Sequence, residues 1–236
     1  MATRKEIKEK QQQRKKEKQK EFIPFLIIGG LVLVVLAIVI VSQISTNTTA
    51  KTDIIIPEIV KANQTDGLTM GDPNAKVTVI EFADFQCPYC GVYWKQVEPT
   101  IIENYVNTGK VRFVYHPFSF LGGGSWDESV KSTEAAYCAN DQGKFWEYRA
   151  MVYANQNGEN QGAFSKAKLL AFAEAIDLDK KSFEQCLVDG VHTKDVNDAT
   201  QAASDYGATF TPSFLVDGNI VGIDTLVDSI EAAINK

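Results

Sequence analysis

The sequence predicts an α/β domain that carries an inserted helical cap and is preceded by one N-terminal transmembrane helix. Three observations predict this architecture. Strand and helix patterns alternate between residues 76 and 115, helical patterns fill residues 122–205, and an uncharged apolar run occupies residues 22–41. The chain has 236 residues, of which 44% are hydrophobic and 23% are charged, and this composition is typical of folded rather than disordered proteins.

Charge is distributed unevenly along the chain. Residues 1–21 contain nine Lys or Arg and four acidic residues, so this tail has a net charge of +5, and the net charge of −6 leaves −11 for the remainder. An acidic body argues against nucleic acid as the main partner, because phosphate binding needs a basic surface. The basic tail is expected to be cytoplasmic, because positive charge stays on that side of a membrane.

Residues 22–41 are predicted to be a transmembrane anchor. They form twenty residues without a charge, and a helix of this length rises about 30 Å, the thickness of a bilayer core. The alternative is a cleavable signal peptide, whose apolar region is about 7–15 residues long and ends in a small-residue cleavage site. This run is longer and no such site follows it, so we expect a single-pass signal-anchor in the cell membrane, with residues 42 onward outside the cytoplasm.

A linker is predicted at residues 42–68, and one folded domain at residues 69–236. The linker begins with a stretch rich in Ser, Thr and Asn that has no helical periodicity. The apolar run around Pro57 is expected to pack on the domain or on the membrane surface.

A C-x-x-C motif lies between a predicted strand at 76–82 and a helix that extends toward residue 106, and a second strand is predicted at 111–115. The motif therefore sits at the start of a helix, where first-turn N–H groups and the helix dipole favour negative charge. Cys87 is expected to be an exposed thiolate with a lowered pKa, and Cys90 a shielded resolving thiol. Pro88 suits the first helical position, because its missing N–H has no partner there anyway.

Glu81 lies inside the apolar strand, six residues before Cys87. Its apolar neighbours indicate burial near Cys90, where a carboxyl group can accept or relay the proton of that thiol during exchange. The alternative is a glutamate at the end of the strand that faces solvent.

A metal knuckle is the alternative interpretation of the C-x-x-C motif. A structural zinc site needs four ligands, which two such motifs usually supply. The sequence has no second C-x-x-C, since Cys138 and Cys186 stand apart in helical patterns. We therefore predict no metal site and favour redox chemistry, with a zinc-knuckle binding module as the minor alternative.

The chain resembles the DsbA-like branch of the thioredoxin superfamily, in its membrane-anchored, extracytoplasmic form. The segments that carry the resemblance lie at residues 70–75, 77–90 (VTVIEFADFQCPYC), 136–139, 142–146 and 209–218. The resemblance implies a thioredoxin fold interrupted by a helical cap, with a last strand near 219–222 and a final helix at 225–234.

The resemblance also implies the residues of a substrate site. Thr211 and Pro212 match the cis-proline loop, whose backbone pairs with substrate peptide in the family, and Glu81 matches the family's buried acidic position. Pro88 and Tyr89, between the two cysteines, are expected to contact substrate. Phe85 is expected to line the same peptide groove.

The implied activity is thiol–disulfide exchange that oxidises cysteine pairs in secreted or surface proteins, with no organic cofactor. The implied partner is a membrane reoxidising protein of the DsbB or VKOR type. The dipeptide between the cysteines departs from the Pro-His of the strongly oxidising prototype, because Tyr89 replaces the histidine. A disulfide isomerase or reductase on the same fold therefore remains an alternative, as does a non-catalytic binding module.

Cys138 and Cys186 both fall in the predicted cap. Similar anchored family members have cysteines at these places, and in an oxidising compartment the two are expected to form a structural disulfide. Two separate buried thiols, or a second redox relay, are the alternatives.

Overall fold

The computed structural model describes residues 53–236. The predicted basic tail and transmembrane anchor, at 1–21 and 22–41, lie outside the described residues. None of the helices between residues 53 and 236 combines the length and apolar character that a membrane crossing requires.

A six-stranded mixed sheet forms the centre of the domain, with the strand order β1-β2-β4-β3-β5-β6. Its strands are β1 (Thr65–Asp66), β2 (Thr69–Met70), β3 (Val77–Ala83), β4 (Val111–Pro117), β5 (Ser213–Val216) and β6 (Asn219–Val221). Only β3 and β4 pair in parallel, and the other neighbours are antiparallel. The predicted strands at 76–82, 111–115 and 219–222 are thus confirmed with small shifts at their ends.

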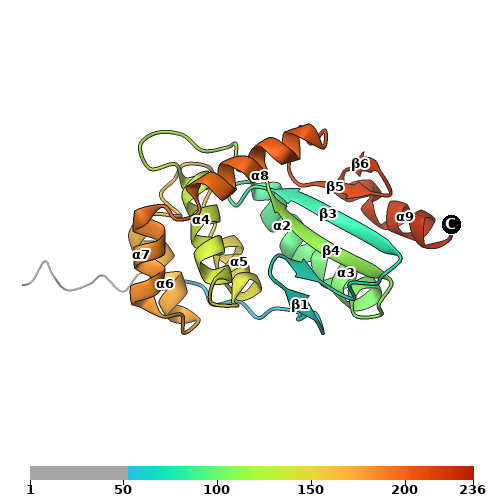
Figure 1. Ribbon diagram of the computed structural model, residues 1–236, viewed down its shortest axis with the longest axis horizontal. Helices are drawn as coiled ribbons and strands as arrows, with labels where there is room; N and C mark the ends of the chain where they lie inside the picture. Colours follow the sequence, from blue (N-terminus) through green and yellow to red (C-terminus); the bar gives the residue numbers. More distant parts are fainter. Residues whose placement is uncertain (1–52) are drawn as a thin grey trace, which may run out of the picture. The chain divides into compact units, whose positions relative to one another are not determined.

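Helices cover both faces of the sheet and extend beyond one of its ends. They are α2 (Pro88–Gln96), α3 (Glu98–Ile101), the π-helix η1 (Ile102–Val106), α4 (Glu128–Asn140), α5 (Phe145–Ala154), α6 (Lys166–Ala175), α7 (Lys180–Asp189), α8 (Thr193–Asp205) and α9 (Ile223–Ile234). Residues of α2, α3, η1 and α9 share one buried cluster with β3, β4 and β5, whereas Ala203 of α8 packs with Phe82 and Phe118 in another. Figure 1 shows α4 to α7 grouped beside one end of the sheet.

The single helix expected after the C-x-x-C motif is divided into three pieces. It begins at Pro88, and α2 ends at Gln96, after which Val97 adopts φ −113° and α3 begins at Glu98. Pro99 explains the break, because proline has no N–H to donate to the carbonyl four residues earlier and its ring clashes there. The short α3 and η1 continue to residue 106 on the same buried face.

The predicted insertion is confirmed, because α4 to α8 separate β4 from β5 in the chain. Helix α4 begins where the Asp127 side chain accepts a hydrogen bond from the backbone N–H of Val130, and α7 begins where Asp179 does the same for Ser182. A further buried cluster joins the helices of the cap to one another. The same cluster contains Cys87 and Cys90. The cap therefore contributes directly to the surroundings of the C-x-x-C motif.

Residues 53–68, which sequence analysis assigned to a linker, belong to the folded domain. Residues 65–70 form a hairpin with Gly67 at φ +53°, and β2 pairs with β4. Before the hairpin, residues 53–62 form an extended strap that packs through Ile54 and Ala62. Asparagine side chains hold the strap through its backbone, which needs no periodic pattern of side chains: Asn155 accepts from the N–H and donates to the C=O of Ile55, and Asn107 donates to the C=O of Lys61.

Candidate active site

Cys87 occupies the N-cap position of α2, directly after the turn that follows β3. The pKa of Cys87 is lowered to about 6. The largest cause is a hydrogen bond from the Cys90 thiol; burial opposes it, and bonds from Thr211 and from the backbone N–H groups of Cys90 and Tyr89 reinforce it. The N–H groups at the start of α2 thus help to lower the pKa of Cys87, as the sequence predicted, but the hydrogen bond from Cys90 lowers it more.

The expected exposure of Cys87 is wrong, because only 4% of this residue is accessible. Thr211 covers it, and the Cys87 Sγ lies 3.2 Å from the Thr211 carbonyl oxygen. Cys90 is fully buried, and burial is the main reason that its pKa lies well above the ordinary value. Both residues carry free thiols in the described part of the chain, so the pair consists of one thiol that ionises readily and one that holds its proton.

The pH dependence of alkylation should reveal this asymmetry. A thiolate reacts and a thiol does not, so the reaction of reduced protein with iodoacetamide should reach half of its maximal rate near pH 6, the pKa of Cys87. Free cysteine reaches that point only at about pH 8.5. Mass spectrometry should locate the fast label on Cys87, and a half-maximum at the pH of free cysteine would contradict the geometry.

The Thr211–Pro212 peptide bond is cis and lies beside Cys87. Sheet register explains this position: β5 begins at Ser213, which pairs with Phe82 near the end of β3. The turn that carries Cys87 follows the end of β3, and the loop with Thr211 and Pro212 precedes the start of β5. Both segments therefore lie at the same end of these two neighbouring strands. An extended peptide that lies against Thr211 would also face the Cys87 sulfur.

Exposed apolar side chains surround the two cysteines. Pro88 is exposed, and Tyr89 is 70% accessible, so both can contact a bound protein. Phe210, next to the cis-proline loop, is also exposed. The expectation that Phe85 lines the groove is wrong, because its ring is fully buried and stacks on Tyr115 with centroids 5.6 Å apart.

A buried ion-pair group lies beneath the cysteines and contains Glu81, Arg149 and Glu98. Side chains alternate between the two faces of β3, so Glu81 lies on the same face as Val77 and Val79. Its side chain is fully buried and does not face solvent. Arg149 of α5 binds Glu98 with two hydrogen bonds of 2.8 and 2.6 Å but binds Glu81 with only one, of 2.8 Å. Within residues 53–236, the second oxygen of Glu81 has no hydrogen-bond partner.

Of the two carboxyl groups that bind Arg149, Glu81 receives fewer hydrogen bonds and has an oxygen without a partner. Glu81 is therefore the one of the two that can more easily carry a proton. Burial raises the pKa of Glu81 to about 8, while the attraction of Arg149 acts in the opposite direction. The raised pKa allows Glu81 to hold a proton at a pH where an ordinary glutamate is ionised. Glu81 and Cys90 each raise the cost of charging the other, since the charge of Glu81 is one cause of the high pKa of Cys90.

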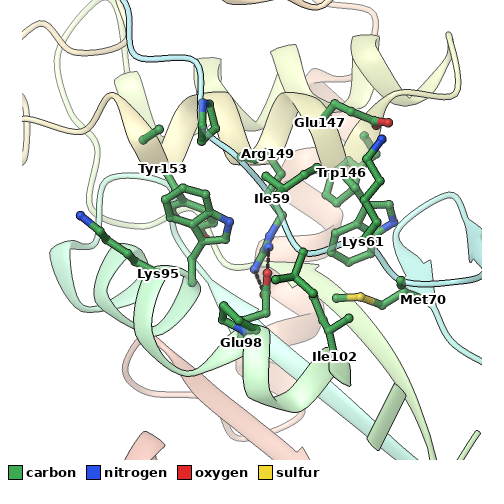
Figure 2. A pocket seen from close by; sticks show the side chains of 18 of the residues that line it. Ile59, Lys61, Met70, Lys95, Glu98, Ile102, Trp146, Glu147, Arg149 and Tyr153 are labelled. Carbon is green, nitrogen blue, oxygen red and sulfur yellow. Dashed lines mark hydrogen bonds and ion pairs between the residues drawn. The ribbon is translucent and has the colours of Figure 1, made fainter. Parts of the chain in front are cut away.

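A cavity of about 1030 Å³ lies beside the active helix, between α2, α3, α5 and the strap. Figure 2 shows Arg149 reaching from α5 toward Glu98, with Trp146, Ile59 and Lys61 around them. Pro88 and Gly91 of α2 also line this cavity. The strap thus forms one wall of a space that begins next to the C-x-x-C motif.

Comparisons with known proteins agree with this geometry. A family model described as Thioredoxin matches residues 63–236. The chain belongs to the thioredoxin family, alongside relatives named disulfide bond formation proteins. The probable disulfide bond formation protein D of Bacillus cereus is 32% identical over 172 residues, which cover 71% of this chain and 77% of that protein.

Two other similarities bear on this chain. The Na(+)/H(+) antiporter NhaA 1 of Salinispora arenicola is 31% identical over 174 residues, and this chain spans only 24% of its length, about a quarter. The crystal structure of oxidised BdbD from Bacillus subtilis superposes with a TM-score of 0.65 at 20% identity, covering 72% of this chain and 94% of that one. The latter similarity concerns the fold.

The sequence patterns did not indicate the roles of Asp84 and Arg149. Asp84 is buried, and its carboxylate accepts hydrogen bonds from the backbone N–H groups of Gln86, Phe120 and Leu121 and from the Ser129 hydroxyl. It thereby joins the turn before Cys87 to the loop after β4. Arg149 lies in α5 between Tyr148 and the apolar segment 150–153, and a charge beside these apolar residues is the sequence signal that could indicate its burial.

A disulfide joins Cys138 of α4 to Cys186 of α7 in the helical cap. Next to it, His192 at the start of α8 contacts Asp141 and Asp195, with distances of 2.8 Å from its two ring nitrogens. The disulfide closes a long loop, because its two cysteines are 48 positions apart in the sequence. It connects helices that enclose the buried cluster around Cys87 and Cys90.

Removing this disulfide should destabilise the domain without changing the active cysteine. Replacing both cysteines by serine should lower the free energy of unfolding by about 2–4 kcal/mol, because the unfolded chain regains the entropy that loop closure removes. Urea unfolding without reductant measures this difference. An unchanged midpoint would show that the disulfide does not stabilise the fold, and an altered pH profile of Cys87 alkylation would favour a redox relay.

Proposed function

We propose that this protein oxidises cysteine pairs in secreted or surface proteins by transferring the disulfide of Cys87 and Cys90. The observation that carries this proposal is the pair's asymmetry, with a pKa of about 6 for Cys87 and a raised pKa for Cys90. A stabilised Cys87 thiolate favours the reduced form of the enzyme. The oxidised form is correspondingly a good electron acceptor.

The first step begins when a substrate thiolate attacks the Sγ of Cys87 in the oxidised enzyme. The Cys87–Cys90 bond breaks, a mixed disulfide forms, and Cys90 leaves as a thiolate that takes up a proton. Glu81, which is buried and has a raised pKa, is the candidate donor of that proton. Its pairing with Arg149 through a single hydrogen bond leaves one oxygen free for this exchange.

The second step completes the transfer of two electrons. The second substrate thiolate attacks the substrate sulfur of the mixed disulfide, so that the substrate disulfide forms and Cys87 leaves as a thiolate. The low pKa of Cys87 makes it a good leaving group. Half-buried Thr211 and exposed Pro88 and Tyr89 would form the surface that holds the substrate, with the carbonyl oxygen of Thr211 3.2 Å from the sulfur. The predicted contact of Pro212 would be indirect, because its side chain is buried behind this surface.

The proposed location is the outer side of the cell membrane. Residues 22–41 would span the bilayer, residues 1–21 would remain in the cytoplasm, and the catalytic domain would face the extracytoplasmic space, as the charge asymmetry favours. A membrane protein of the DsbB or VKOR type would return the Cys87–Cys90 pair to its disulfide form. Anchoring would keep the two proteins close.

The resting redox state of Cys87 and Cys90 in cells tests the direction of this exchange. Acid quenching followed by thiol trapping should recover the pair mainly as a disulfide. Recovery of both thiols in reduced form in most molecules would instead favour a reductase or isomerase. Trapping the Cys138→Ser/Cys186→Ser variant in parallel assigns the signal to the C-x-x-C pair.

A further inference from the structure

The loop that follows α5 binds the turn that carries Cys87. Gln156 in this loop donates from its Nε2 to two backbone carbonyl oxygens, that of Phe85 at 2.6 Å and that of Cys87 at 3.1 Å. Since both partners are acceptors, only the NH₂ end of the amide fits at this position. The side chain therefore connects the cap to residues immediately before and at the N-cap of α2.

Gly91 provides the space for this amide. A Cβ atom at residue 91 would lie 2.1 Å from the Oε1 and 3.1 Å from the Cδ of Gln156, well inside contact distance. The carboxamide consequently rests against the first turn of α2. Glycine is a poor helix former, so this close approach gives a physical reason for its presence one residue after Cys90.

Further contacts hold the turn on either side of Gln156. The backbone N–H of Asn160 donates to the Gln86 side chain at 2.5 Å, and Asp84 accepts from the Gln86 backbone N–H at 2.9 Å. These bonds restrain residue 86 but leave the carbonyl groups of Phe85 and Cys87 to Gln156. The Cys87 carbonyl otherwise accepts only a long helical bond of 3.3 Å from Gly91 within the described residues.

We propose that Gln156 is a positioning residue for Cys87: by binding the carbonyl groups of Phe85 and Cys87, it holds the turn so that the first-turn N–H groups of α2 point at the Cys87 sulfur. The N–H groups concerned are those of Tyr89 and Cys90. The inference deepens the proposed function, on which it rests for the role of Cys87. Gln156 is uncharged, so it acts through backbone geometry and not through a charge of its own.

The first test replaces Gln156 with methionine, which has similar length but no donor. We expect the ratio of thiolate to thiol at Cys87 at a pH near 6 to fall about threefold to tenfold, the size expected when one hydrogen bond that favours a single protonation state is lost. The ultraviolet absorbance of the thiolate during a pH titration of the reduced protein gives this value. Asn157→Ala, in the same loop but exposed, is the matched control and should titrate as the wild type does.

The second test uses the contact with Gly91. Gly91→Ala should displace the Gln156 amide and reproduce the shift caused by Gln156→Met, whereas adding Gly91→Ala to Gln156→Ala should cause no further shift, because the new methyl group then has space. Equal titration curves for wild type, Gln156→Met and Gly91→Ala would overturn the proposal, even if melting temperatures differ. Titration requires no substrate, so this outcome is distinguishable from failure of the wild type to oxidise dithiols, which would refute the proposed function instead.

Discussion

Cys87→Ser should reduce the oxidation of a dithiol peptide to the uncatalysed rate. Serine cannot form the disulfide that accepts the electrons, and Cys90 is fully buried and keeps its proton, so it cannot replace Cys87 as the sulfur that substrate attacks. The measurement is the rate of peptide disulfide formation with catalytic enzyme and excess glutathione disulfide. Substantial dithiol oxidation by the Cys87→Ser protein would defeat the mechanism.

Cys90→Ser provides the complementary result. In this variant the Cys87 thiolate can attack a substrate disulfide, which forms a mixed disulfide and releases one substrate thiolate. The variant lacks the Cys90 thiol whose attack on Cys87 would release the rest of the substrate, so covalent complexes should accumulate. Non-reducing electrophoresis should show them, and reductant should release them. The Cys138→Ser/Cys186→Ser variant is the control, because it keeps both active cysteines and should accumulate no such complex.

Arg149→Met should destabilise the fold by about 3–5 kcal/mol, the usual cost of leaving a buried charge without its partner. Arg149 is 1% accessible and binds both Glu81 and Glu98. Its guanidinium also lies 4.9 Å from the ring of Tyr115, 5.0 Å from that of Tyr153 and 5.3 Å from that of Trp146. Urea unfolding of wild type and variant measures the loss.

The same variant has a predicted pH dependence. The pKa of Glu81 is raised from 4.5 to about 8, so its contribution to stability is complete below about 4.5 and declines as pH rises through about 8. Without Arg149 the charged form costs more, so the loss should be larger at about pH 8 than at about pH 5. Adding Glu81→Gln and Glu98→Gln should recover much of the stability, because no unpaired buried charge remains. An equal loss at both pH values would contradict this account.

Local sequence patterns predicted the parts of the site that depend on neighbours in the chain. The strand before Cys87, the helix that begins at Pro88 and the final helix α9 follow from apolar periodicity and from proline geometry. Thr211–Pro212 could be assigned only through the resemblance to a family, because a cis bond leaves no mark in local composition.

The remaining parts depend on contacts between distant residues. Arg149 meets Glu81 across a separation of 68 residues, and Gln156 meets Cys87 across 69, so no periodic pattern indicates either pair. Residues 53–62 resemble a linker in sequence because they have no helical periodicity, whereas their fixed position depends on contacts with distant residues such as that between Ile55 and Asn155. Phe85 was placed in the groove because an aromatic residue near the cysteines was read as surface, whereas the cap buries it.

The standard potential of the Cys87–Cys90 couple tests the central claim most directly. Equilibration of the protein with glutathione mixtures of known ratio, followed by trapping and mass analysis, gives this value for the C-x-x-C pair. Because the reduced form contains a stabilised thiolate, we predict an oxidising potential, toward about −120 mV. A potential near about −270 mV, as in thioredoxin, would contradict the proposal and assign the protein to reduction.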